Sequence, residues 1–135
     1  MALPIAHPLD EVTVHGAALD CSTGKAVIIR APFKGTLKES GTMLGSVLST
    51  ADATATLSIA GTAVTGGSWV ITQSGSAIGD LDAAAVSGVV ANGVTANSTI
   101  TGANTCLEGD VIKIALTGSG TAGGILMGYA TIRRG

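Results

Sequence analysis

Aromatic residues are nearly absent from this chain of 135 residues, in which Phe33, Trp69 and Tyr129 are the only three. Valine, isoleucine, leucine, methionine and alanine must therefore fill the core, and such side chains suit a thin sandwich better than a thick globule. The length is that of one domain, and folding at this size buries roughly two thirds of the surface of the unfolded chain. A self-sufficient core is therefore expected without a metal or a disulfide.

Charge is also scarce, since only 12% of the residues are charged and the net charge is −2. The usual charged share is about 25%, and binders of nucleic acid or of membrane surfaces carry a basic excess. Neither nucleic acid nor a membrane is therefore expected as a partner. A surface so poor in charge favours contact with other proteins.

Long hydrophobic runs are missing as well. No stretch reaches the roughly 18 consecutive apolar residues of a membrane helix. The beginning of the chain, MALPIAHPLDEVTV, lacks the basic and apolar regions of a signal peptide. We therefore expect synthesis and folding in a cytoplasm.

Cysteine is limited to Cys21 and Cys106, and no histidine lies near either in the sequence. This spacing does not make a zinc site. We interpret both residues as reduced thiols packed like small hydrophobic side chains, while a disulfide between them would need oxidation after release from the cell.

Catalytic and cofactor motifs are weak throughout. His7 and His15 lie in the proline-containing first 20 residues, away from any nucleophile that a base could activate. The G-x-G-x-x-G match at 118–123 precedes a predicted strand rather than a helix, so it predicts a hairpin turn and no dinucleotide site. The sequence therefore predicts no enzyme and no cofactor.

Acidic residues suggest turns rather than a metal centre. Asp80, Asp82, Glu108 and Asp110 lack the D-x-D-x-D-G spacing that arranges oxygen ligands around calcium. Gly79-Asp80 and Gly109-Asp110 are typical of turns that lead into the next element. No metal site is predicted.

What the chain does contain is a series of short strands. Residues 53–59 alternate apolar residues with threonine and serine, Ala60-Gly61 predicts a turn, and 68–75 and 108–118 alternate in the same way. Residues 81–86 are expected to form a short helical turn capped by an aspartate, and 93–101 a strand. No fixed-period repeat supports a parallel β-helix. We therefore predict an all-β, jelly-roll-like β-sandwich of about eight short antiparallel strands at 21–135, preceded by an extended N-terminal arm at 1–20.

A set of turn motifs lies within residues 26–133: Ala31-Pro32, Gly35, Ile59, Gly61, Val64-Thr65-Gly66, Ser74-Gly75-Ser76, Gly79-Asp80 and Gly109-Asp110. These motifs resemble those of small capsid decoration (cement) and head-fibre proteins of tailed phages. The resemblance implies a β-sandwich that is commonly trimeric, and it brings no catalytic or ligand-binding residue with it.

The function implied is that of a structural virion protein on the exterior of the capsid, with the major capsid protein and further copies of itself, as a homotrimer, for partners. Contacts with the shell or a neighbouring protomer are expected at the arm and at the end of the chain, through Leu3, Ile5, Val12, Val14, Arg133 and Arg134. The alternative is a head-fibre or tail appendage module that binds a host surface or a glycan. The scarcity of aromatic side chains argues against sugar stacking.

Overall fold

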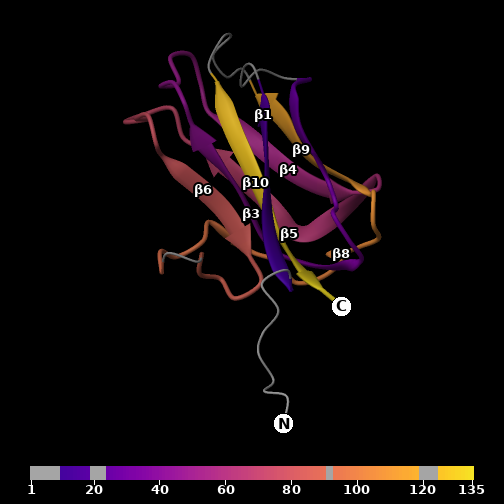
Figure 1. Cartoon of the computed structure of the whole chain (residues 1–135). Helices are drawn as coiled ribbons and strands as arrows, with labels where there is room; N and C mark the ends of the chain where they lie inside the picture. Colours follow the sequence, from indigo (N-terminus) through magenta and orange to yellow (C-terminus); the bar gives the residue numbers. More distant parts are fainter. Residues whose placement is uncertain (1–9, 19–23, 91–92, 119–124) are drawn as a thin grey trace.

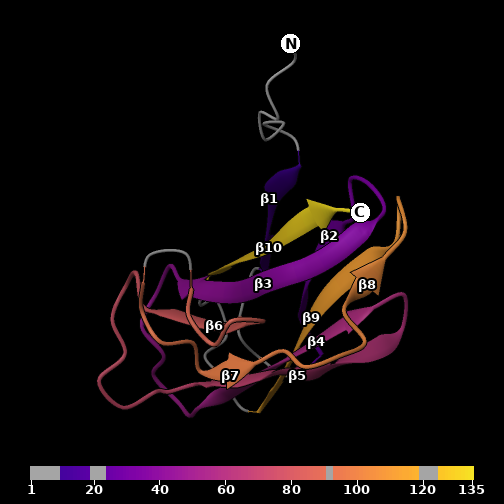
Figure 2. The ribbon, with the colours of Figure 1, turned by 90° about the horizontal axis from the view of Figure 1, so that it is seen from below.

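The computed structural model describes residues 10–18, 24–90, 93–118 and 125–135, and in these residues the protein is an all-β sandwich of two sheets (Figure 1; Figure 2). The predicted all-β sandwich is confirmed, with ten strands in the described residues where about eight were expected. No helix that could cross a membrane occurs in the described ranges. The strands are β1 (Glu11–Ala18), β2 (Ala26–Arg30), β3 (Gly35–Leu44), β4 (Ala53–Ile59), β5 (Thr62–Ile71), β6 (Leu81–Ala85), β7 (Ser98–Thr99), β8 (Thr105–Cys106), β9 (Val111–Gly118) and β10 (Leu126–Arg134).

The two sheets differ in size. The six-stranded sheet has the order β1-β10-β3-β6-β7, with β8 paired to the beginning of β3, and the four-stranded sheet has the order β2-β9-β4-β5. The named pairs are antiparallel, except that β6 and β7 run parallel. Because β1 and β2 belong to different sheets, the chain crosses from one layer to the other near its beginning.

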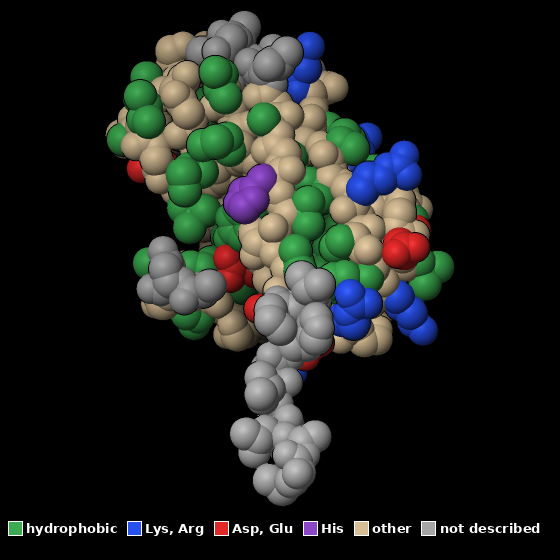
Figure 3. Space-filling model, viewed as in Figure 1, with side chains coloured by type: hydrophobic (Ala, Val, Ile, Leu, Met, Phe, Trp, Pro, Cys, Tyr) green, Lys and Arg blue, Asp and Glu red, His purple; other side chains and the backbone are tan. Residues whose placement is uncertain are grey.

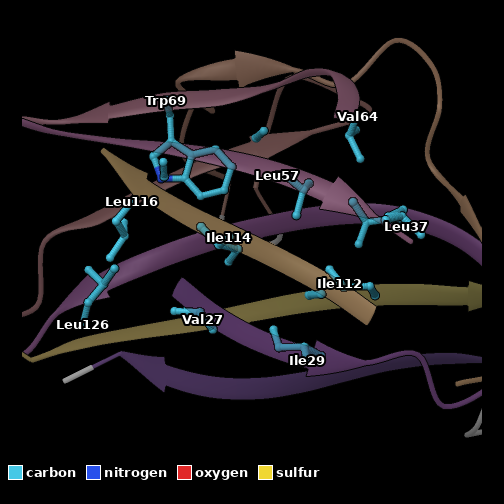
Figure 4. Packing of buried hydrophobic residues seen from close by; sticks show 14 of the residues in the cluster. Val27, Ile29, Leu37, Leu57, Val64, Trp69, Ile112, Ile114, Leu116 and Leu126 are labelled. Atoms are coloured by element: carbon cyan, nitrogen blue, oxygen red, sulfur yellow. The ribbon is translucent and has the colours of Figure 1, made fainter. Parts of the chain in front are cut away.

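The core lies between the sheets and is built from alternate residues of the long strands. In β9, Ile112, Ile114 and Leu116 are buried while Lys113 is exposed, as the alternation in the sequence predicts. Figure 4 shows these side chains in one layer with residues of the neighbouring strands. Aliphatic side chains thus supply most of the packing that aromatic residues supply in other domains.

Trp69 is the one large aromatic side chain that anchors the core, and it is 3% exposed. Its indole Nε1–H donates a hydrogen bond to Oγ1 of Thr42 in β3, at 3.0 Å. This bond joins the two sheets and satisfies the only polar atom of the indole. The neighbouring Val70 points outward and is 47% exposed, so the predicted faces of this strand are confirmed.

The β4–β5 hairpin has the predicted turn. Ala60 and Gly61 both have positive φ values, 49° and 84°, as the two central residues of a type I′ turn require. β5 begins directly after this turn at Thr62, earlier than the strand predicted at 68–75, and its register against β4 shifts between Thr56 and Ser58. Gly66 lies in the shifted part, where a Cβ would come within 1.9 Å of the Thr99 carbonyl oxygen. Only glycine permits this approach.

The helical turn expected at 81–86 is wrong, because Leu81–Ala85 form strand β6 against β3. Alanine favours helix locally, but here Ala83, Ala84 and Ala85 are at most 1% exposed. Their small side chains allow close packing: a Cβ on Gly41 would come within 2.8 Å of the Ala83 Cβ. The strand expected at 93–101 shortens to β7.

The predicted arm also differs from the structure. Glu11–Ala18 form β1, which pairs with β10 along its whole length, and the half-buried Val12 and Val14 pack against the core. Alternation across Glu11–Gly16 had indicated a strand, and the partner that holds it, β10, lies more than 100 residues away in the sequence. The folded domain therefore begins by residue 11. Residues 1–9 lie outside the described residues.

Candidate interaction surface

The turns that the sequence placed at its Gly-Asp pairs are present, and they account for Asp80 and Asp110. The Asp80 carboxylate accepts a hydrogen bond from the Ala77 amide and the Asp110 carboxylate one from the Leu107 amide, each at 2.8 Å. In both cases the carboxylate closes its own turn. Within the described ranges, no group of three or more His, Cys, Asp or Glu residues is placed to hold a metal ion.

Cys106 is a core residue and not a reactive one. It is free and buried, and its thiol lies 3.6 Å from the Gly35 carbonyl oxygen and 3.7 Å from that of Phe33. Burial raises the pKa of the Cys106 thiol, which keeps it protonated and unreactive. The interpretation of this residue as a small hydrophobic side chain is confirmed, while Cys21 lies outside the described residues.

The outer face of the six-stranded sheet is the surface with the most distinctive chemistry. Figure 3 views this face: hydrophobic side chains gather over β3 and β6, while the Lys and Arg side chains in view lie on the other side of the histidine. The antiparallel register places residues that point away from the core side by side, in three rows that cross β1, β10, β3 and β6 in this order. The first row is Ala17, Met127, Met43 and Leu81, the second His15, Tyr129, Gly41 and Ala83, and the third Thr13, Thr131, Glu39 and Ala85. The two alanines of β6 in the second and third rows are nevertheless buried.

We name the outer-face patch as Met43, Leu81, Met127 and Tyr129. Met43 and Met127 are 38% and 46% exposed although they lie in the middle of the sheet. Exposed methionines adapt their shape to a partner, and adjoining apolar side chains on an outer face mark contact surfaces. The patch is therefore a candidate for protein contact.

Tyr129 lies at the centre of the patch over the bare backbone of Gly41, where a Cβ would come within 2.8 Å of the tyrosine ring. Its hydroxyl donates a hydrogen bond to the Glu39 carboxylate. Burial, and then the hydrogen bond with Glu39, raise the pKa of Tyr129 well above its usual value. The phenol therefore keeps its proton and remains a donor that fixes the carboxylate in place.

A β-bulge brings Glu39 to this face. Thr131 pairs with Glu39 and Ile132 pairs with Leu37, so Lys38 is an extra residue in β3. The bulge aims two consecutive side chains outward instead of one. Lys38 and Glu39 consequently lie next to each other on the outer side.

Two adjoining depressions hollow the face around Tyr129. One, of about 300 Å³, is lined by Thr13, His15, Glu39, Met43, Leu81, Val90, Tyr129 and Thr131. The other, of about 240 Å³, shares His15, Met43 and Tyr129 and adds Met127 and Gly128. The His15 and Tyr129 rings, 6.4 Å apart between centroids and tilted by 43°, stand at their common border.

The predicted contact residues are spread over different environments. Leu3 and Ile5 lie outside the described residues, and Val12 and Val14 face the core. Arg133 is exposed on the outer face, opposite Glu11 in the register.

Arg134 takes part in the fold itself. Its guanidinium lies 4.2 Å from the centre of the Phe33 ring, and its backbone amide donates to the Asp10 carbonyl oxygen. Of the predicted residues that the structure describes, Val12 and Val14 face the core while Arg133 and Arg134 are exposed.

Sequence reasoning missed the outer-face patch. The signal was present in β10, where Leu126, Ala130 and Ile132 form the buried set, so that Met127 and Tyr129 fall on the opposite face. An apolar residue on the polar side of an alternating strand could have identified the surface.

Comparison with known proteins identifies neither a family nor a curated relative of this chain. No protein-family model matches the chain, and no curated protein matches it. Among solved structures, a chain of the cyanophage Pam1 capsid asymmetric unit is similar, with a TM-score of 0.48 and 16% sequence identity over 100% of this chain and 93% of that chain. A TM-score and an identity this low carry no argument about function.

Proposed function

We propose that this protein is a structural virion protein of a tailed phage, a capsid decoration (cement) protein that binds the outer surface of the major capsid protein shell and stabilises it. The turn motifs that resemble such proteins suggest the class. The observation that carries the proposal is the outer-face patch, an apolar contact surface on a domain whose described residues assemble no metal site.

The shape of the domain suits this role. The patch lies on a sheet held from behind by a continuous core, so little backbone conformational entropy is lost when it meets a partner. A specific interface buries about 800 Å² on each partner, and the exposed Val86 and Val89 extend the apolar surface beyond the patch. Residues 1–9, with Leu3 and Ile5, would add contacts along the shell.

The alternative, a head-fibre or tail appendage module that binds a host surface or a glycan, has less support. Sugar-binding sites use exposed aromatic rings, yet Trp69 and Phe33 are only 3% and 7% exposed. Only Tyr129 is partly exposed, whereas a sugar-binding site usually presents several exposed rings. Saturable binding of the isolated protein to a glycan array, without binding to shells, would favour this alternative.

The first prediction concerns the oligomer. We expect a homotrimer, because a charge-poor surface favours self-association and capsids offer three-fold positions that a closed symmetric cluster fits. Light scattering at micromolar concentration, with and without shells, measures it. A strict monomer in solution and on the particle would refute the trimer.

The second prediction concerns the shell. Particles that carry the protein should release their DNA at a higher temperature than particles without it. A ligand that binds only the assembled shell stabilises the shell by RT ln(1 + [L]/Kd), which is about 2.7 kcal/mol per site when the free ligand concentration is 100 times Kd. Heating both kinds of particle and following DNA release checks this. Identical release temperatures would contradict the cementing role.

A matched pair of variants tests the surface itself. Met127→Asp places a charge in the outer-face patch and should reduce shell binding at least tenfold, since a buried unpaired charge is costly. Val70→Asp places the same charge on the outer face of the other sheet, at a residue of nearly equal exposure (46% and 47%). It should leave shell binding unchanged.

A further inference from the structure

We propose that the depression beside Tyr129 is a binding site for an arginine side chain of the partner protein. The inference rests on the proposed function in one respect, namely that the arginine belongs to a shell protein. The recognition chemistry is contained in this chain alone.

The walls of the depression fit the aliphatic part of an arginine. Met43, Leu81 and Val90 are among the residues that line this space of about 300 Å³. Long basic side chains bury their methylene groups along apolar surfaces of this kind while the charged end reaches a polar partner.

The end of the depression supplies a negative charge. Glu39 lines it, and the Tyr129 hydroxyl, which remains protonated, holds the carboxylate in position. A carboxylate has about four lone-pair sites, so a guanidinium can bind beside the partners that Glu39 already has in the fold. Carboxylate and guanidinium form short, charge-assisted and frequently bidentate hydrogen bonds.

The aromatic rings favour arginine over lysine. The rings of Tyr129 and His15 stand at the border of the depression, and a planar guanidinium stacks on aromatic faces while an ammonium is a compact, strongly hydrated charge. The chain already uses this contact internally, where the Arg134 guanidinium lies over Phe33.

The surrounding charges permit a cation. Neither lysine nor arginine lines the two depressions beside Tyr129. Lys38 lines a separate hollow on the other side of Glu39, together with Glu11, Val86 and Val89. The Thr13 and Thr131 hydroxyls are hydrogen-bonded to each other at 2.8 Å. Both residues line the hollow that contains Lys38 and also the depression beside Tyr129.

The test uses Nα-acetyl-arginine amide as the probe and NMR of the methionine methyl groups as the readout. We expect saturable shifts at Met43 and Met127, weaker shifts with the lysine analogue, and none with the uncharged norleucine analogue. Equal effects from norleucine would show a purely apolar surface, and stronger binding of lysine would show a simple charge preference. Either result would overturn the assignment to arginine.

Variants locate the site. Glu39→Gln retains an oxygen that can accept from Tyr129 but removes the charge, so probe affinity should fall at least fivefold with little change in the thermal melt. Glu108→Gln, at an exposed glutamate elsewhere, is the control and should bind the probe like the native protein. Unchanged affinity in Glu39→Gln would overturn the proposal.

Shell binding of the same variants separates the two proposals. If the native protein binds the probe but not shells, the proposed function fails and the arginine site stands. If shells bind the native protein and Glu39→Gln equally and the probe does not bind, the arginine site fails and the proposed function stands.

Discussion

Deleting residues 1–18 is expected to destabilise the domain by more than about 5 kcal/mol, which is comparable to the whole stability of many domains. The deletion removes β1, its backbone hydrogen bonds to β10, and the cover that Val12, Val14 and Ala18 give the core. Each lost hydrogen bond costs about 0.5–1.5 kcal/mol, and each valine that no longer packs on the core costs up to about 2 kcal/mol. Urea unfolding followed by circular dichroism measures the change.

Deleting only residues 1–9 is the matched control. It leaves β1 intact, so the midpoint of unfolding should stay nearly unchanged, while shell binding should weaken through the loss of Leu3 and Ile5. A cooperative transition with an unchanged midpoint after deletion of 1–18 would show that β1 contributes nothing to the stability of the domain.

Replacing Trp69 by alanine is expected to cost about 3–5 kcal/mol, the usual range for truncating a buried aromatic side chain. The substitution opens a cavity between the sheets and leaves the Thr42 hydroxyl, 1% exposed, without its indole partner. Because the core has so few large side chains, neighbours such as Leu57 and Ile71 cannot fill the space without moving strands.

The comparison variant is Val70→Ala, one residue along and on the outer face. It should change the free energy of unfolding by no more than about 0.5 kcal/mol, as surface substitutions usually do. Denaturant unfolding of both variants gives the two values. A loss below about 1 kcal/mol for Trp69→Ala would contradict the role of the indole as the anchor between the sheets.

The sequence predicts those elements of the structure that are determined by their own residues rather than by distant partners. The alternation of residues 53–59 and the Ala60-Gly61 turn are local, and the structure has both as expected. The same holds for Ile112, Ile114 and Leu116, whose period of two identifies the buried face of β9 without knowledge of its partners.

The segments that sequence reasoning misjudged depend on distant partners. Ala83, Ala84 and Ala85 favour helix in isolation, and it is the adjacent β3, with glycine at position 41, that draws them into a strand. β1 looked like part of an arm because its partner β10 lies at the other end of the chain. Tertiary pairing overrides local propensity in both cases.

The candidate site was less predictable than the fold for the same reason. The residues of the site come together only through the β3–β10 register, and a bulge turns Glu39 outward. The residues that meet in this way are Glu39, Met43, Met127 and Tyr129. Nothing in the sequence near Tyr129 points to Glu39, 90 residues earlier. The arm and the terminal arginines were the expected contacts because termini are visible in a sequence, whereas a sheet face is not.

Cryo-electron microscopy of virions that carry this protein tests the central claim most directly. The account predicts density for the two-sheet domain on the exterior of the shell, with the outer face of the β1-β10-β3-β6 sheet against the major capsid protein and Met43 and Met127 at the contact. Density at a tail or fibre tip, or a domain bound to the shell through the β2-β9-β4-β5 sheet with the outer-face patch in solvent, would contradict it.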